Sequence, residues 1–231
     1  MKLNQDASAR WRDSAVDIGE HCRRMVADGL ALGTAGNLSC RVDDHVIISP
    51  SSVPYGKLEP QDMWVLSLDG EVEQEGSAAP SSETPFHLAV YGSTKAGAVV
   101  HTHSPEVVAV STTLDELPAI HYAIARLGGP VPVVRYQRFG SDSLAAEVRA
   151  ALTGGVPRSA AILQNHGAVT YGRNLAEAYE KALLLEWLAR VFRLARQIGE
   201  PRILSTEELD EVMAEAMRRR YSMAPRDGET R

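Results

Sequence analysis

The chain is poor in cysteine and has no long apolar run, and each shortage removes a class of protein. Only Cys22 and Cys40 are present among 231 residues, which excludes a disulfide framework and a cysteine-based zinc site. No window approaches the roughly 18 uninterrupted apolar residues of a membrane span. The polar N-terminus lacks the apolar core of a signal peptide. We therefore expect a cytoplasmic protein with no membrane partner.

A basic surface is missing as well. The 30 acidic residues outnumber the 24 lysines and arginines, giving a formal net charge of -6, which argues against a nucleic-acid partner. Any phosphate group must then be bound by donors placed locally. The composition, 44% hydrophobic and 23% charged, is that of an ordinary globular protein, and the length suits one domain spanning residues 1–231.

Two further chemistries find no support in the sequence. No G-x-G-x-x-G motif follows a predicted strand and no Walker-type lysine loop is present, so nucleotide chemistry is not indicated. Schiff-base catalysis needs a lysine in an apolar or cationic pocket. The four lysines of the chain do not sit in such surroundings: Lys2, Lys57, Lys95 and Lys181.

Short strands alternate with helices along the chain, which predicts a single α/β domain. Several neighbouring strands are close enough to form hairpins, so we expect a sheet that is not all parallel. Thr84 is predicted to cap a helix with Pro85 in its first turn. The predicted helices are 8–30, 84–92, one from 104, a short one from about 117 to 128, 141–152, 174–198 and one from 205 toward 220. The predicted strands are 38–42, 46–48, 63–68, 98–103, 131–134 and 159–164.

Candidate site residues gather between Pro80 and Pro105. His101 and His103 stand two apart at the end of an apolar run, so on a strand they share a face and can bind one divalent cation. His166 follows a second apolar run, and Glu83 is a lone acid before a predicted helix. Three imidazoles and a carboxylate are the ligands of a catalytic zinc. Any one of these histidines, taken alone, is more often a structural residue, and spacing does not establish that they converge.

A zinc ion at this site would polarise a carbonyl oxygen and stabilise an enediolate. Glu83 would then serve as fourth ligand and, once substrate displaces it, as general acid or base. His87 lies within the predicted helix and is expected to be a packed or partly exposed residue and not a ligand. Two small-residue loops, 33–39 and 49–54, can bind an anion through backbone N–H groups or can be simple connections.

These motifs together resemble the class II aldolase/adducin family, in particular its bacterial L-fuculose-1-phosphate aldolases. The resemblance covers nearly the whole chain, and several motifs in one order are more specific than any of them alone. The matching segments are Gly33-Thr34-Ala35-Gly36-Asn37, Ser81-Ser82-Glu83, His101-Thr102-His103, Pro118-Ala119-Ile120-His121-Tyr122, Gln164-Asn165-His166-Gly167 and Tyr221.

The resemblance implies a three-layer α/β/α fold with a central mixed, largely antiparallel sheet. It also implies one zinc ion, or another divalent metal, per subunit, and a homotetramer with active sites between subunits. Tyr122 corresponds to the proton donor to the aldehyde oxygen, contributed by the adjacent subunit. Tyr221 corresponds to the tyrosine of a mobile tail, from about residue 221, that closes the site. The metal ligands correspond to Glu83, His101, His103 and His166, and the phosphate-binding residues to Gly36, Asn37, Ser51, Ser52, Ser81 and Ser82.

Two positions depart from the family pattern. Ser52 replaces a glycine, which is costly if the position needs a positive φ angle. Thr84-Pro85 follows the glutamate where the fuculose enzymes often carry bulkier residues. Arg218, Arg219 and Arg220 suit either a helix C-terminus or a phosphate contact, and the sequence leaves both open.

The function implied is reversible, zinc-dependent cleavage of a ketose 1-phosphate, a small phosphorylated sugar, to dihydroxyacetone phosphate and a short aldehyde. The metal would chelate the C2 carbonyl and C3 hydroxyl oxygens. A sugar-phosphate 4-epimerase is the first alternative, although family epimerases usually carry aspartate in place of Glu83. A decarboxylase or dehydratase of a related phosphorylated keto sugar acid is another, because the same enediolate serves each reaction. A non-enzymatic, adducin-like assembly module is the last.

Overall fold

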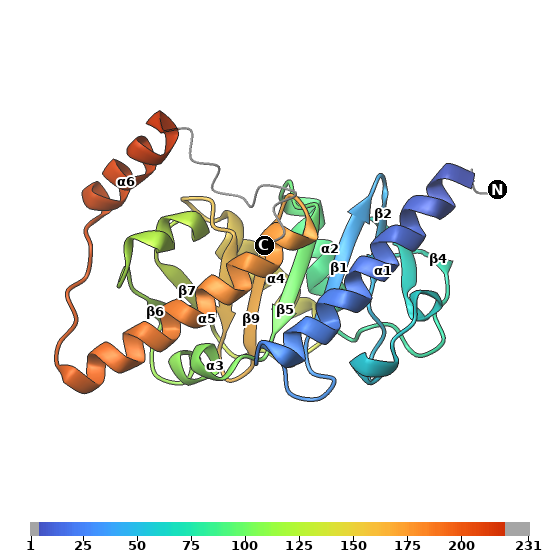
Figure 1. Ribbon diagram of the computed structural model, residues 1–231, viewed down its shortest axis with the longest axis horizontal. Helices are drawn as coiled ribbons and strands as arrows, with labels where there is room; N and C mark the ends of the chain where they lie inside the picture. The colour runs from blue at the N-terminus through green and yellow to red at the C-terminus, as the bar shows by residue number, and fades with distance from the viewer. Residues whose placement is uncertain (1–4, 220–231) are drawn as a thin grey trace, which may run out of the picture.

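The computed structural model describes residues 5–219, which form a mixed sheet of nine strands covered by helices (Figure 1). The strands lie in the order β4-β3-β2-β1-β5-β9-β8-β7-β6. Among these residues only β7 and β8 pair in parallel; the other neighbouring strands are antiparallel. The strands are β1 (Asn37–Val42), β2 (His45–Ile48), β3 (Trp64–Ser67), β4 (Val72–Gln74), β5 (Ala98–Thr102), β6 (Glu116–Leu117), β7 (Val131–Val134), β8 (Ala160–Leu163) and β9 (Gly167–Gly172).

Helices cover both faces of the sheet. In Figure 1, α1 and α5 cross the near face, while α2 and α4 lie behind it. This is the three-layer α/β/α arrangement that the sequence predicts. The helices are α1 (Gln5–Ala27), α2 (Thr84–Ser93), α3 (Pro105–Ser111), α4 (Asp142–Thr153), α5 (Leu175–Ile198) and α6 (Thr206–Arg218), with short 3-10 turns η1 (Tyr55–Lys57), η2 (Pro60–Asp62) and η3 (Tyr122–Leu127).

Strand periodicity decides which face carries the site. Val100 of β5 belongs to the core beneath α1 and α5, whereas Val99 belongs to the core beneath α2 and α4. Because side chains alternate between the faces of a strand, His101 shares the face of Val99. Its ring indeed lies 5.3 Å from that of Phe86 in α2, edge to face.

Most of the predicted elements are present within a few residues. The antiparallel pairing of β1 with β2 confirms the expected hairpin, and Asp69-Gly70 lies in the turn between β3 and β4. The strand β9 was not expected, and the predicted helical stretch from residue 117 begins only at Tyr122. Leu117 instead pairs with Val131, as part of β6.

The predicted helix cap at Thr84 is wrong. Glu83 occupies the N-cap position of α2, and its side chain caps nothing. Thr84 is the first helical residue, and its Oγ1 donates to the carbonyl of Ser81 at 2.7 Å. Glu83 therefore stands at the helix entrance with its carboxylate left for other partners.

The last described helix, α6, begins at the expected place and with a capping box. Ser205 Oγ accepts from the backbone N–H of Glu208, and the Glu208 carboxylate accepts from the N–H of Ser205. Arg220, Tyr221 and the predicted mobile tail lie outside the described residues. Within residues 5–219, no helix is long and apolar enough to cross a membrane.

Candidate metal centre

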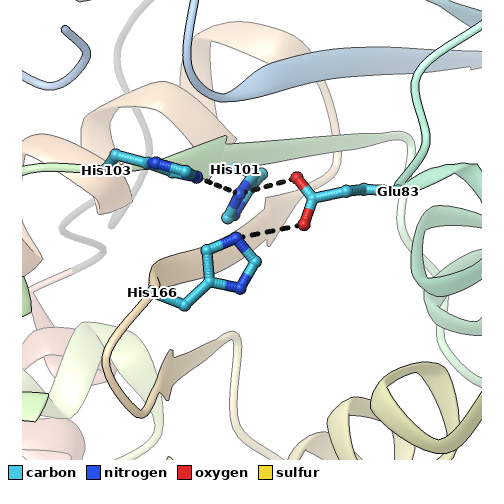
Figure 2. A group of neighbouring side chains, drawn as sticks. All are labelled: Glu83, His101, His103 and His166. Carbon is cyan, nitrogen blue, oxygen red and sulfur yellow. Dashed lines mark hydrogen bonds and ion pairs between the residues drawn. The ribbon is translucent and has the colours of Figure 1, made fainter. Parts of the chain in front are cut away.

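Four side chains from three parts of the fold converge at one end of β5 (Figure 2). His101 lies within β5, His103 just beyond it, His166 in the turn between β8 and β9, and Glu83 at the start of α2. Each offers a ligand atom, and these atoms all lie within 4.8 Å of one another. The three imidazoles and the carboxylate predicted to converge are therefore close enough to contact one common ion.

The hydrogen bonds of His101 indicate what the cluster needs. Its Nδ1 lies 2.9 Å from the carbonyl oxygen of Ala168, which can only accept, so Nδ1 carries the proton. In a neutral ring Nε2 then has only a lone pair, yet it lies 2.8 Å from Glu83 Oε2 and 2.9 Å from His103 Nε2. Lone pairs facing a carboxylate repel one another unless a cation lies between them.

Glu83 shows the same need from the other side of the cluster. Its Oε1 is buried and has no hydrogen-bond donor, although His166 Nε2 is only 3.1 Å away. Glu83 Oε1 and His166 Nε2 are thus close together without forming a hydrogen bond, as two atoms that bind the same ion would be. A divalent cation bound by imidazole nitrogens and a carboxylate would satisfy these atoms together, so the residues fit a metal ion.

Electrostatics sets the protonation states that ligands require. Burial alone would raise the pKa of Glu83, but the imidazoles of His101 and His166 hold it well below its usual range. Burial, followed by the charges that His101 and His166 carry when protonated, lowers the pKa of His103 to about 3. At neutral pH the carboxylate is therefore ionised and the His103 ring is neutral, as metal binding demands.

Glycine and a strained asparagine bring His166 into the cluster. Asn165 adopts a left-handed φ of 56°, and its backbone N–H donates to Ser111 Oγ of α3 at 3.0 Å. A Cβ atom at Gly167 would lie 2.0 Å from the carbonyl oxygen of Thr102. Only glycine lets β9 approach β5 this closely, and that approach places His166 beside His101 and His103.

A cavity of about 320 Å³ adjoins the cluster and contains all the predicted phosphate-binding residues. The two loops left open by the sequence meet at this cavity, and no lysine or arginine among residues 5–219 lines it. Its lining includes Glu83, His103 and His166, the predicted Gly36, Asn37, Ser51, Ser52, Ser81 and Ser82, and residues that the sequence reasoning did not assign to the site, Thr34, Ala35, Pro50, Tyr136, Gln137, Phe139 and Asn165.

Besides Asn165, two of these cavity residues have left-handed backbones. Gly36 has a φ of 85°, and a Cβ there would lie 2.6 Å from the carbonyl oxygen of His101. Ser52 has a φ of 62°, so the position where this chain departs from the family pattern does require a positive φ. Serine bears that conformation at a cost that glycine avoids.

Asn37 connects this cavity to the Glu83 carboxylate. Its Nδ2 donates to Glu83 Oε2 at 2.9 Å, while its Oδ1 lies 2.6 Å from His87 Nε2. His87 is fully buried, and burial together with the nearby His101 lowers its pKa to about 3. His87 is therefore a packed, neutral histidine outside the metal cluster, which agrees with the expectation that it is not a ligand.

The remaining predicted site residues are not brought to the cluster. Tyr122 is 57% exposed and does not line the cavity; its ring stacks on His121, with centroids 4.4 Å apart. Tyr221 lies outside the described residues. Arg218 and Arg219 both pair with Glu215 of α6, and neither lines the cavity. The buried Lys181 pairs with Glu177 and does not line the cavity.

Comparisons with known proteins agree with one another. Residues 16–192 match the family model described as class II aldolase and adducin N-terminal domain. Over 197 residues the chain is 38% identical to a 5-deoxy-D-ribulose 1-phosphate aldolase of Bacillus thuringiensis serovar kurstaki, covering 84% of this chain and 91% of that protein.

A second relative and a solved structure point the same way. The chain is 39% identical over 202 residues to the L-fuculose phosphate aldolase of Escherichia coli (strain K12), covering 86% of this chain and 92% of that protein. An L-fuculose 1-phosphate aldolase of known structure superposes with a TM-score of 0.83 at 32% identity, covering 89% of this chain and 96% of that chain.

Proposed function

The chain belongs to the class II aldolase and adducin family and is an aldehyde-lyase of that class, and we propose that it reversibly cleaves a ketose 1-phosphate to dihydroxyacetone phosphate and a short aldehyde. The observation that carries this proposal is the convergence of Glu83, His101, His103 and His166 beside a hydroxyl-lined cavity. The relatives act on two different sugar phosphates by their names, so the aldehyde half of the substrate stays open.

We assign the metal to one zinc ion per subunit, bound by His101, His103, His166 and Glu83. Neutral imidazoles with one carboxylate suit zinc, and the buried Glu83 Oε1 without a donor supports a cation here. When bound, zinc supplies electron withdrawal from the C2 carbonyl and C3 hydroxyl oxygens of the substrate.

We assign the phosphate group to the cavity. Gly36, Asn37, Ser51, Ser52, Ser81 and Ser82 line it together. They offer hydroxyl groups, backbone N–H groups and one side-chain amide, all neutral donors. A phosphate bound there would place the ketone of the same small molecule next to the four clustered side chains.

Glu83 is assigned the proton transfer at carbon. When the C3–C4 bond breaks, C3 of the departing enediolate must receive a proton, and in the reverse direction it must lose one. Glu83 is 5% exposed, and its carboxylate can accept this proton in the direction of synthesis and return it in the direction of cleavage. Among the described residues that line the cavity, it is the one carboxylate.

Tyr122 is assigned the proton transfer at the aldehyde oxygen, acting from an adjacent subunit. Tyr122 is exposed and does not line the cavity of its own chain, which supports a contact with the substrate bound to another copy. A homotetramer with active sites between subunits provides that arrangement. The closing role of Tyr221, a single domain over residues 1–231 and a cytoplasmic location stay predictions.

A product assay tests the proposal against its alternatives. Purified protein is incubated with L-fuculose 1-phosphate, 5-deoxyribulose 1-phosphate and phosphorylated keto sugar acids, with and without a chelator, and dihydroxyacetone phosphate is measured enzymatically. We expect its release from at least one ketose 1-phosphate, loss of release with chelator, and recovery with zinc. Epimerised pentulose phosphate as the product would assign a 4-epimerase instead, and carbon dioxide or water release a decarboxylase or dehydratase.

A further inference from the structure

Behind Glu83 and Asn37 runs a buried chain of polar side chains, Ser39, His87 and Tyr91, to which the proposed reaction gives no role. Glu83, His87 and Tyr91 follow one another at intervals of four residues, so they share one face of α2. Asn37 and Ser39 stand two apart on β1 and share a face of that strand. The helix face and the strand face interlock, alternating one residue from each.

The distances form an unbroken line from Tyr91 to Glu83. Tyr91 Oη lies 2.8 Å from Ser39 Oγ, and Ser39 Oγ lies 2.7 Å from His87 Nδ1. His87 Nε2 lies 2.6 Å from Asn37 Oδ1, and Asn37 Nδ2 lies 2.9 Å from Glu83 Oε2. All five side chains are 6% exposed or less.

Chemistry fixes the direction of every bond. A carboxylate only accepts, so the Asn37 nitrogen donates to Glu83 and the Asn37 oxygen is left to accept. His87 must therefore carry its proton on Nε2 and accept on Nδ1. Ser39 then donates to His87 and accepts from Tyr91. All the donors thus run one way, toward the Glu83 carboxylate, and a chain of this kind strengthens each of its members.

We propose that His87, supported by Ser39 and Tyr91, is a positioning residue that fixes the Asn37 amide and, through it, the orientation of the Glu83 carboxylate. This inference rests on the proposed function of Glu83. If substrate displaces Glu83 from the metal, the carboxylate must still be oriented toward the reacting carbon. The hydrogen bond from Asn37 Nδ2 can provide that orientation, because it does not depend on the metal. Outer partners of this kind commonly govern how a ligand or base is presented.

The role of His87 as a hydrogen-bond donor can be distinguished from its role in packing. An apolar residue at 87 would fill the same space against Phe86, whose ring stacks on that of His87 at 4.8 Å. It would leave Asn37 Oδ1 buried without a donor, and the amide would be free to turn its oxygen toward Glu83. The carboxylate would then face an acceptor instead of a donor.

A pair of amide variants tests the proposal. In His87→Gln the side-chain amide reaches about as far as Nε2 and can still donate to Asn37, whereas in His87→Asn it reaches only the Ser39 end. We expect His87→Asn to lower the rate of dihydroxyacetone phosphate release about 10- to 100-fold, with KM and zinc affinity changed less than about threefold. His87→Gln should recover most of that rate.

His21→Asn is the matched control, because His21 is also a buried histidine but lies on α1, against Tyr179. Its rate should equal that of the wild type. Equal losses in His87→Asn and His87→Gln, no loss in His87→Asn, or a loss matched by weaker zinc binding would each overturn the positioning role.

A second measurement uses the metal-free protein and so does not depend on activity. Long-range proton–nitrogen NMR spectra report the tautomer of each imidazole. We expect His87 at pH 7 to be neutral, with a slowly exchanging proton on Nε2 that shifts in Ser39→Ala and Tyr91→Phe. A proton on Nδ1 would contradict the network. If the wild type releases no dihydroxyacetone phosphate while this signature is present, the proposed function fails and the hydrogen-bond chain stands.

Discussion

The imidazole of His121 meets the indole of Trp187 edge to face, with ring centroids 4.9 Å apart and an interplanar angle of 84°. The His121 ring also contacts the ring of Tyr122, with centroids 4.4 Å apart. Trp187 lies on α5 and is 45% exposed. A helix that covers the sheet therefore supports, through the His121 ring, the tyrosine that we assign to the neighbouring active site.

Trp187→Ala should therefore weaken catalysis from a distance. Aromatic pairs contribute about 0.5–1.5 kcal/mol beyond burial, and losing one would leave Tyr122 free to sample other rotamers. We expect kcat to fall about three- to tenfold, with less effect than in Tyr122→Phe. Steady-state kinetics measure this, and Leu194→Ala, an exposed position on the same helix, is the control that should leave kcat unchanged.

Mixed oligomers test whether active sites lie between subunits. Glu83→Gln and Tyr122→Phe each disable a different contributor, so a site has both groups intact only when a Tyr122→Phe chain supplies the carboxylate and a Glu83→Gln chain supplies the tyrosine. If the subunits are unfolded together in equal amounts and refolded, about one site in four should be intact by random assembly. Activity of the mixture no higher than that of the separate variants would place Glu83 and Tyr122 in the same chain's site.

Replacing the carboxylate alone should separate binding from proton transfer. In Glu83→Gln the three histidines are intact, so we expect zinc to remain bound at one equivalent per subunit. Exchange of the C3 proton of dihydroxyacetone phosphate with solvent should fall about 10²- to 10⁴-fold, the usual contribution of a general base. NMR in deuterium oxide measures the exchange, and an unchanged exchange rate would remove Glu83 from that role.

Ser52→Gly should stabilise the protein. A non-glycine residue in the left-handed region destabilises the folded state by roughly 1–2 kcal/mol. Glycine removes this strain, but its larger conformational entropy in the unfolded chain offsets roughly 0.5–1 kcal/mol of the gain. We expect the free energy of unfolding to rise by up to about 1 kcal/mol in urea titrations. Ser51→Gly, next to it but without a positive φ, should lower the same quantity.

Acid should destabilise the metal-free protein through its buried histidines. The pKa of His87 is about 3 in the folded state and about 6.5 when unfolded. Between these values the unfolded chain binds a proton that the folded chain does not. Stability therefore falls as pH falls through this window, by up to about 1.4 kcal/mol per pH unit for each such group.

His103, lowered to about 3 as well, adds a second contribution of the same sign. Urea unfolding at pH 7, 6 and 5 with chelator present measures the slope. In His87→Gln the slope of the unfolding free energy against pH should decrease by up to about 1.4 kcal/mol per pH unit, the contribution of one proton. An identical slope in that variant would show that His87 does not remain neutral in the folded chain.

The metal cluster and the helix boundaries set by local signals could be predicted from the sequence. Two histidines on one face of a strand, and a third after another strand, predicted the cluster because metal ligands must converge. The capping box at Ser205 and the stop at Gly128 followed from local backbone preferences, which need only a few neighbouring residues. Local signals predict such features correctly when no tertiary contact overrides them.

Other features depend on contacts between segments far apart in the chain. Thr84 was expected to cap α2, but Glu83 takes that position because its carboxylate meets the clustered histidines. Asn37 contacts Glu83 across 46 residues, and Tyr136, Gln137 and Phe139 reach the cavity from a loop that carries no motif. The strand β9 escaped prediction because glycines stand at both of its ends.

The place of His101 within β5 limits how this chain can change. β5 is paired on both sides, with β1 and with β9, and its side chains alternate between two different cores. Deleting or inserting one residue between Ala98 and Val100 would turn His101 toward α1 and α5 and bury it in the wrong core, with composition almost unaltered. We therefore expect substitutions along this stretch to alter stability gradually, whereas a change in its length would remove His101 from the metal centre.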